Sequence, residues 1–447
     1  MHRIRLLIGC GIPLFFVPLV SFAQKYNIYT TTLPNGLEVI AVENHIVPLV
    51  TVEIDVHNGS FTEPPDYNGL SHLYEHMFFK ANASIPSQEK YLERARQLGM
   101  SWNGTTGEER VNYFFTLSKD SLLQGMQFMK AAITTPLFLE SELEHERPVV
   151  TGEYDRAEAN PAYHLFVAVN KKLWFEYYSR KNPLGERSVI LAADQQKMQT
   201  IKKRYYVPNN SALIVTGDVD HREVFALARA QFADWPRGED PFALYPVPEH
   251  PPLPHSDTVI VEQPVNAVTV MISREGPSVT KDPAATYAAD VLSYILTQRA
   301  STFQKHLVES GLCTFASLSY QTLNHTGPIT VSARMSGKRY REGIAQLFKE
   351  MDALTSADYY TDGQLENAKI QLERGETYDQ ESPSSFAHTI GYWWSVTGSL
   401  DYYLHYVDNL RRVTREDINA YVRKYIAGKP YVMGILVSPE DRKTILP

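Results

Sequence analysis

The sequence predicts an α+β fold built from two related units, and three observations lead to this prediction. Residues 50–56 alternate apolar and polar side chains, which is typical of a half-buried strand. Residues 285–296 and 341–354 place apolar side chains at helical spacing. A basic helix that ends in tyrosine, followed seven residues later by an apolar strand, occurs around Tyr206 and again around Tyr425. The two halves are therefore predicted to be duplicated domains.

Length and composition fit a folded two-domain protein. The chain has 447 residues, of which 43% are hydrophobic and 21% are charged, so it can bury sizeable cores. We assign residues 24–236 to the first domain and 257–447 to the second. A linker at residues 237–256 joins them, because its prolines disfavour regular strand pairing. The net charge of −8, without a basic stripe, argues against nucleic acid as a partner.

The N-terminus is typical of a secretory signal peptide that ends at residue 23. Residues 1–5 are basic, residues 6–20 are mostly apolar, and residues 21–23 form a small-x-small cleavage site. The apolar run is too short to span a bilayer, and no other stretch approaches the roughly 20 apolar residues required. We therefore expect a periplasmic or secreted protein without a membrane span. Cys313 would be its one remaining cysteine, so no internal disulfide is expected.

The segment His72-Leu-Tyr-Glu75-His76 suggests metal chemistry. His72 and His76 are four residues apart, so on a helix they share a face and can bind one ion. Glu75 can act as a general base on a water molecule at that ion. Apolar residues at helical spacing predict a helix here, and residues 68–71 are expected to supply its cap. The spacing is that of the inverted zinc motif H-x-x-E-H; the alternative is that both histidines only pack on a half-buried face.

A catalytic zinc ion needs a third protein ligand, and Glu153 is the candidate because it lies in an acidic stretch with helical character. Glu153 ends the sequence Glu-Arg-x-Val-Val-x-x-Glu. Together with the His-Leu-Tyr-Glu-His motif, this sequence resembles the pitrilysin/insulinase family of zinc metallopeptidases. Further segments fit that family in chain order, namely residues 58–60, 102–105 and 204–210.

The resemblance implies a complete set of site residues: zinc ligands His72, His76 and Glu153, general base Glu75, and a supporting carboxylate, Glu146. Proline favours the first turn of a helix, so Pro148 predicts that the helix bearing Glu153 begins near it and leaves Glu146 outside. The family binds peptide as an added strand beside residues 102–105. Asn103 is therefore the expected substrate contact, and a simple turn asparagine is the alternative.

The resemblance also implies the architecture. Each unit is expected to be a mainly antiparallel sheet with helices packed on one face, and the two units together form half of a clamshell. Only the first unit is expected to be catalytic, because residues 285–296, at the corresponding place in the second, carry no ligands. The family's second half usually offers an arginine and, seven residues later, a tyrosine to a facing active site. Residues 305–316 lack both.

We therefore expect a zinc metalloendopeptidase with one zinc ion per chain that hydrolyses short or unfolded peptides. A homo- or heterodimer with a homologous chain would complete the clamshell. Two alternatives remain open. The chain is either a zinc-bearing subunit active only in a hetero-oligomer, or a non-catalytic assembly or binding subunit of the same fold.

Overall fold

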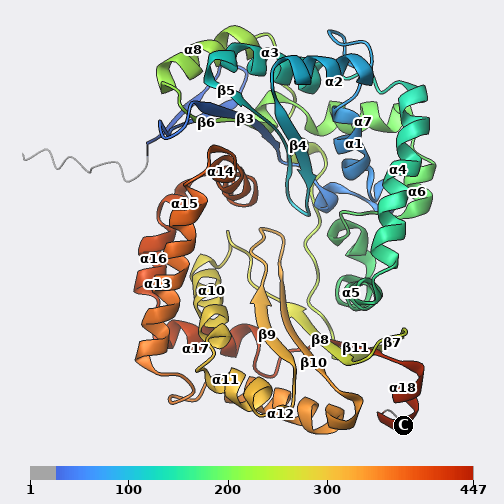
Figure 1. The fold of residues 1–447 in the computed structure, drawn as a ribbon, viewed down its shortest axis with the longest axis vertical. Helices are drawn as coiled ribbons and strands as arrows, with labels where there is room; N and C mark the ends of the chain where they lie inside the picture. Colours follow the sequence, from blue (N-terminus) through green and yellow to red (C-terminus); the bar gives the residue numbers. More distant parts are fainter. Residues whose placement is uncertain (1–26, 446–447) are drawn as a thin grey trace, which may run out of the picture.

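Two β-sheets organise the chain (Figure 1). The computed structural model describes residues 27–445, so the predicted signal peptide lies outside the described residues. The first sheet has the spatial order β1-β2-β6-β3-β5-β4, and the second has the order β7-β11-β8-β10-β9. The first comprises β1 (Ile28–Thr32), β2 (Glu38–Glu43), β3 (Leu49–Val56), β4 (Ser101–Thr106), β5 (Val111–Ser118) and β6 (Ser211–Gly217). The second comprises β7 (Asp257–Glu262), β8 (Val268–Glu275), β9 (Phe315–Tyr320), β10 (Pro328–Met335) and β11 (Val432–Val437).

Strands β2 to β6 and strands β7 to β11 are arranged in the same way. In each sheet the first strand of the set pairs in parallel with the last one, as β2 does with β6 and β7 with β11. All the other neighbouring pairs are antiparallel. The prediction of two homologous, mainly antiparallel units is therefore confirmed.

Helices surround both sheets. Those of the first unit are α1 (Leu70–Phe78), α2 (Gln88–Gln97), α3 (Leu122–Thr134), α4 (Glu140–Glu158), α5 (Pro161–Trp174), α6 (Arg187–Leu191), α7 (Gln195–Tyr205) and α8 (His221–Phe232). Those of the second are α10 (Pro283–Thr297), α11 (Thr302–Gln304), α12 (Tyr340–Ala353), α13 (Asp362–Asp379), α14 (Pro383–Thr397), α15 (Asp401–Leu404), α16 (Tyr406–Arg412), α17 (Arg415–Tyr425) and α18 (Pro439–Ile445).

The segment between the sheets, residues 237–256, contains one helical turn, α9 (Pro241–Leu244), and otherwise no helix or strand. The domain boundaries themselves stay a prediction. None of the helices within residues 27–445 is both long and apolar enough to cross a membrane.

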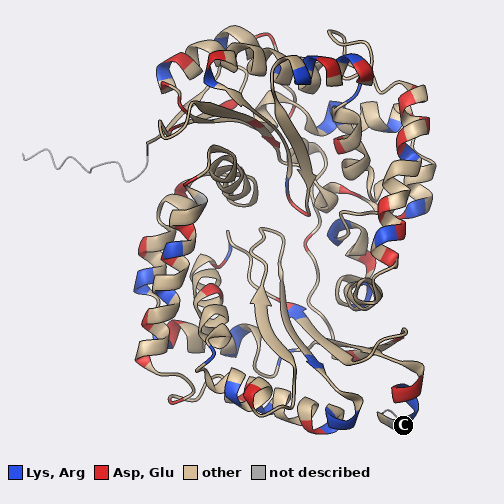
Figure 2. Cartoon of the chain, in the orientation of Figure 1, with Lys and Arg blue, Asp and Glu red and all other residues tan. Residues whose placement is uncertain are grey.

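One face of the first sheet is covered by helices of its own unit. Helix α3 packs on β3 and β5, and α8 packs on β2. Val50, Val52 and Ile54 point into this core and are fully buried. This arrangement confirms the predicted packing of helices on one face. Figure 2 shows acidic and basic residues interspersed along the outer helices.

The opposite face of each sheet is covered by a helix of the other unit. Helix α14 packs on β3 and β6, whereas α5 packs on β7, β8 and β11. Glycine permits both contacts. A Cβ atom at Gly391 on α14 would lie 2.4 Å from Asp55 Oδ2, and one at Gly434 on β11 would lie 2.3 Å from Val169 Cγ2. The two units are therefore interlocked by exchanged helices.

This exchange explains why β3 is not the half-buried strand that its alternating sequence predicts. Thr51, Glu53 and Asp55 are 0% exposed, because α14 covers the face that would otherwise meet solvent. Glu53 is paired across the two units, since its Oε2 atom lies 2.5 Å from Nδ1 of His388 on α14. The expectation of a half-buried strand is wrong here, and the polar side of β3 forms part of the contact between units.

Candidate metal centre

Helix α1 presents the histidine motif on the side that faces away from the core. Leu70, Leu73 and Met77 are buried at helical spacing and anchor the helix. His72 and His76 lie one turn apart on the opposite, half-buried side. The helix is therefore fixed by its apolar face, and both imidazoles remain available for binding.

Residues 68–71 supply the N-cap of α1, as expected, but no side chain of the N-cap residue caps the helix. The N-cap residue is Gly69, with φ of 94° and no side-chain cap. Glu63, from the preceding segment, accepts hydrogen bonds from the backbone N–H groups of Gly69 (2.7 Å) and Ser71 (2.6 Å). Burial raises the pKa of Glu63 to about 7, despite these hydrogen bonds. The start of the motif helix is thus held by a carboxyl group that the sequence pattern did not identify.

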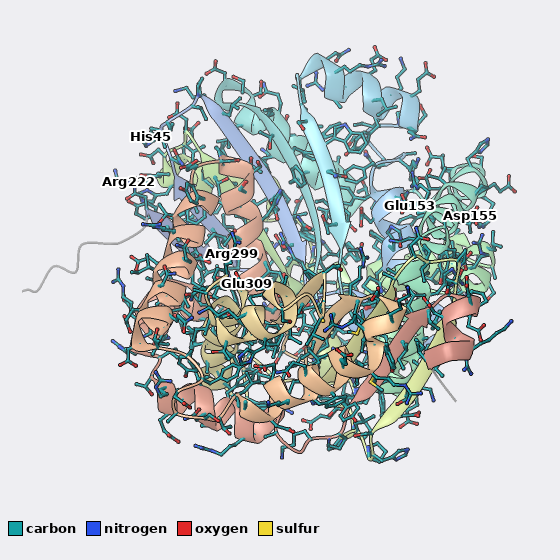
Figure 3. All side chains as sticks on the ribbon, turned by 60° about the horizontal axis from the view of Figure 1, so that its bottom comes forward. His45, Glu153, Asp155, Arg222, Arg299 and Glu309 are labelled. Atoms are coloured by element: carbon teal, nitrogen blue, oxygen red, sulfur yellow. The ribbon has the colours of Figure 1, made fainter. Side chains whose placement is uncertain are left out.

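The structure brings the three predicted ligands together. His72 Nε2 lies 3.3 Å from His76 Nε2 and 3.3 Å from Glu153 Oε2, and His76 Nε2 lies 3.9 Å from Glu153 Oε2. Ligand atoms about 2.0–2.1 Å from a tetrahedral zinc ion lie about 3.3 Å apart. Two of the three separations equal this edge length and the third, 3.9 Å, is longer, so the three atoms lie close to the arrangement of one face of a zinc tetrahedron. Figure 3 shows Glu153 on α4 beside α1.

Hydrogen bonds on the far sides of the ligands fit the same interpretation. His76 Nδ1 lies 2.8 Å from Glu146 Oε1, which favours the proton on Nδ1 and leaves the Nε2 lone pair free. Glu153 uses its Oε1 atom to accept a bond from Arg156 (3.2 Å), and the hydrogen bond with His72 lowers the pKa of Glu153. The donor set of two imidazoles and one ionised carboxylate suits zinc.

Helix α4 corrects the expectation for Glu146. The helix runs from Glu140 to Glu158 through Pro148, so Glu146 lies inside it and not before its start. The buried side chains of Leu143 and Val150 hold the helix on both sides of the proline, which removes one backbone hydrogen bond without ending the helix. Glu146 and Glu153 are seven residues apart and share one face.

Lys80 completes the support behind His76 and was not identified from the sequence. Its Nζ atom lies 2.5 Å from Glu146 Oε2, and both side chains are largely buried. Burial alone would raise the pKa of Glu146, but the hydrogen bonds with His76 and Lys80 lower it. Glu146 is therefore held as a carboxylate between a lysine and a ligand histidine.

Glu75 is positioned by the edge strand β4. Thr106 Oγ1 donates a hydrogen bond to Glu75 Oε2 at 2.7 Å. A Cβ atom at Gly104 would lie 2.9 Å from Glu75 Cγ, so only glycine lets the strand approach this closely. Glu75 is not part of the three-ligand cluster. The Glu75 carboxylate is therefore not assigned as a metal ligand, and its hydrogen bond with Thr106 orients it.

Asn103 lies on the same strand but on the other face. Residues alternate along a strand, so Asn103 points away from the side on which Gly104 and Thr106 meet Glu75. Its side chain is exposed. The structure does not bring Asn103 to the three-ligand cluster, and its role as a substrate contact stays a prediction.

A second group of possible ligands, Glu43, Asp220 and His221, lies at the start of α8. Glu43 Oε1 accepts the backbone N–H of His221 (2.9 Å) and lies 2.7 Å from its Nδ1 atom. Asp220 accepts the backbone N–H of Arg222 (2.8 Å). Because these atoms already cap the helix, the cluster is explained by structure alone.

Comparison of the sequence with family models gives two matches in succession. The model described as "Insulinase (Peptidase family M16)" matches residues 38–185. The model described as "Peptidase M16 inactive domain" matches residues 192–372. The chain belongs to the M16, or insulinase, peptidase family. The resemblance predicted from the His-Leu-Tyr-Glu-His motif is confirmed.

Named relatives match different shares of the chain. Human insulin-degrading enzyme is 28% identical over 226 residues, which cover 49% of this chain and 22% of that enzyme. An uncharacterized zinc protease of Rickettsia felis is 22% identical over 371 residues, covering 82% of this chain and 87% of the relative. The beta subunit of the mitochondrial-processing peptidase of Blastocladiella emersonii is 24% identical over 46% of this chain and 44% of its own length. The chain matches less than a quarter of the length of the insulin-degrading enzymes.

Solved structures share the fold. A protease from Helicobacter pylori superimposes with a TM-score of 0.82 at 20% identity, covering 92% of this chain and 100% of that one. The periplasmic protease PqqL from Escherichia coli has a TM-score of 0.75 at 17% identity, covering 95% of this chain and 49% of that one. At these identities the likeness concerns the fold of two interlocked units.

Proposed function

We propose that this protein is a zinc-dependent endopeptidase with one zinc ion per chain, held by His72, His76 and Glu153. The observation that carries the proposal is the triangle of ligand atoms, with separations of 3.3, 3.3 and 3.9 Å. Relatives named zinc proteases support it. The matched "inactive domain" model covers residues 192–372, which include α7, β6 and α8 of the first unit and β7 to β10 of the second, but not the His-Leu-Tyr-Glu-His motif.

The residues of the site divide the reaction between them. Zinc supplies Lewis-acid chemistry, because it lowers the pKa of water to about 7 and polarises a peptide carbonyl. Glu75 takes the proton of the attacking water and gives it to the leaving amine. Thr106 fixes the orientation of the Glu75 carboxylate through its hydrogen bond. Glu146 and Lys80 hold His76 in the tautomer that binds metal.

The substrate class follows from the position of β4. This strand pairs with β5 on one side, and no strand of the described chain pairs with its other side. A short or unfolded peptide can add there as a further strand, through main-chain hydrogen bonds that tolerate many sequences. Asn103, exposed on this strand, is the side chain proposed to contact it.

The two-unit chain is proposed to work as a dimer with a homologous chain. Relatives named as beta subunits of mitochondrial-processing peptidase favour a heterologous partner. Residues 305–316, which lack the arginine and tyrosine expected from the resemblance, point the same way. Such a partner would supply these groups and close the other half of the clamshell over the peptide.

Export to the periplasm or the medium is also a proposal. Its support is the signal-peptide pattern of residues 1–23. Sequencing the N-terminus of the protein recovered from the cell envelope tests it. A chain that begins at Gln24 is expected, and an intact Met1 would contradict export by this route.

Metal analysis and a quenched-fluorescence peptide assay test the enzymatic proposal on the chain from Gln24 onward. We expect one zinc ion per chain and hydrolysis that a chelator abolishes and zinc restores. Glu75→Gln should keep its zinc and lose about 10²–10⁴-fold in kcat. His72→Ala should lose zinc as well as activity. A Glu75→Gln protein with full activity, or a wild-type protein without zinc, would contradict the mechanism.

A further inference from the structure

Three consecutive charged residues form the turn between β4 and β5. They are Glu108, Glu109 and Arg110, and none is exposed. Charged side chains in a hairpin turn ordinarily point into water. Glu109 bonds directly to the second unit. Glu108 and Arg110 pair with first-unit residues that in turn contact the second unit.

Glu109 binds the tip of the β9–β10 hairpin. Its carboxylate accepts the backbone N–H groups of Asn324 and His325, both at 2.6 Å, and lies 3.2 Å from His325 Nδ1. Glu109 is 3% exposed. Burial would raise its pKa, but the bonds with His325 and the charge of Lys181 lower it. The residue is thus a buried carboxylate that holds a loop of the second unit by its backbone.

Lys181 holds the same loop from the other side. Its Nζ atom donates to the carbonyl oxygens of His325 (2.9 Å) and Thr326 (2.7 Å) and pairs with Glu108 Oε2 (3.1 Å). The lysine is 5% exposed and also lies over the ring of Trp174. The loop is therefore enclosed between Glu109 and Lys181, both of which belong to the first unit.

Arg110 ties the turn to strand β3 of its own unit. Its Nε atom donates to Asp55 Oδ1 (2.6 Å), and its Nη2 atom donates to Glu53 Oε1 (2.5 Å). The other oxygen of Glu53 meets His388 of α14. The turn is therefore bonded directly to loop 322–326 of the second unit. It is linked to α14 only indirectly, through Glu53.

The other end of this turn adjoins Glu75, the proposed general base. Thr106, the last residue of β4, donates to Glu75 Oε2 at 2.7 Å. Gly107 follows directly, and its carbonyl oxygen accepts the N–H of Ser60 at 3.2 Å. The backbone position of Thr106 is thus set by the β4–β5 turn. Glu109, three residues after Thr106, anchors this turn on loop 322–326.

We propose that Glu109 is a positioning residue, through which the second unit fixes Thr106 and the free edge of β4 relative to Glu75. The inference rests on the proposed peptidase function and gives the second unit a defined part in it. A general base must stay within hydrogen-bond reach of the proton it removes, and a misplacement of 1 Å can cost about 10²-fold in rate. Releasing loop 322–326 should misplace the base without touching the ligands.

Glu109→Gln is the test variant. The amide keeps the shape of the side chain, but its NH2 group faces one of the two backbone N–H donors, so at least one bond is lost. Lys181→Met weakens the loop from the opposite side and serves where Glu109→Gln fails to fold. Glu249→Gln, an exposed carboxylate paired with Lys281, is the charge control. Ile435→Val, a buried change in β11, is the stability control.

The measurements are zinc content, kcat and KM, and backbone hydrogen exchange. We expect Glu109→Gln to keep zinc, to lose about tenfold to 10²-fold in kcat with KM less affected, and to exchange faster over residues 101–107 and 322–326 but not over residues 211–217. Both controls should resemble wild type in kcat and in exchange of residues 101–107.

Two results would overturn the inference. One is unchanged exchange over residues 101–107 in a folded Glu109→Gln protein, which would show that the loop does not hold β4. The other is faster exchange with unchanged kcat, which would show that β4 does not position the base. If the wild-type protein shows no hydrolysis, the proposed function fails, whereas the exchange comparison still decides whether Glu109 holds β4.

Discussion

Replacing Glu146 by glutamine tests how much the groups behind a ligand contribute to the metal site. Glu146 lies between His76 Nδ1 (2.8 Å) and Lys80 Nζ (2.5 Å). Glutamine keeps one acceptor oxygen, so it can serve only one of these donors, and its NH2 group opposes the other. The substitution also removes the negative charge that makes His76 more basic.

Two magnitudes follow. Loss of a carboxylate that supports a ligand histidine lowers metal affinity by about 10–100-fold, which corresponds to about 1.4–2.7 kcal/mol. Breaking a buried ion pair by removing one partner costs about 3–5 kcal/mol. The retained amide oxygen can still accept a bond from Lys80, so the loss of stability should lie at the lower end of that range. We therefore expect weaker zinc binding and a lower free energy of unfolding.

Competition with a zinc chelator of known affinity measures the first effect, and urea unfolding of the metal-free protein measures the second. Glu144→Gln is the matched control, because Glu144 lies on the same helix, carries the same charge and is exposed. An unchanged zinc Kd in a folded Glu146→Gln protein would refute the role assigned to Glu146. A loss of equal size in Glu144→Gln would refute the argument that position, and not charge alone, is responsible.

Three further outcomes are expected. Gly391→Ala should destabilise the protein by about 1–3 kcal/mol in urea unfolding, because the added Cβ atom would meet Asp55. Gly375→Ala in α13, where the added Cβ atom has open space, should be neutral or stabilising by up to about 1 kcal/mol. Equal effects of the two substitutions would contradict the close contact at Gly391. Burial lowers the pKa of His57 from 6.5 to about 4. The contribution of neutral His57 to the free energy of unfolding is therefore complete above pH 6.5, and it decreases by up to about 1.4 kcal/mol per pH unit as the pH falls toward 4. His57→Gln should remove that component from the pH dependence of unfolding of the metal-free protein, and identical slopes would exclude it. Light scattering should show a dimer, and adding a homologous chain that carries the missing arginine and tyrosine should raise peptidase activity; full turnover by a monomer would contradict the assembly.

Most parts of the site that the sequence predicted are close together along the chain, and Glu153 is the exception. His72, Glu75 and His76 lie within one helical turn, so their spacing alone predicts a shared face. Glu153 was predicted from an acidic helix and a family resemblance, and the structure brings it to 3.3 Å from His72. The alternating apolar and polar residues at 50–56 correctly predicted strand β3. Its burial could not be predicted, because the helix that covers its polar face lies more than 300 residues further along the chain.

The missed residues share a different property: each acts on a partner outside its own helix or strand. Glu63 caps α1 from the preceding segment, and Lys80, just past the end of that helix, reaches Glu146 on α4. A lysine four residues after a ligand histidine was a usable signal, because its charge needs a partner when the neighbouring side chains are apolar. Thr106 lies two residues after Gly104 on the strand already predicted to hold substrate, so the period of that strand also indicated it.

The residues proposed to carry out the reaction and the elements that hold them in position are divided between the two units. The proposed zinc ligands and Glu75 all belong to the first unit, as the sequence predicts. The turn that follows β4 is nevertheless held by loop 322–326 of the second unit. Arg110 in this turn also binds Glu53, which contacts α14 of that unit. A unit without ligands therefore determines where the edge strand and Thr106 lie. Under the proposed role of Glu109, the exchanged helices and the bonded hairpin tips make the geometry at Glu75 depend on both units.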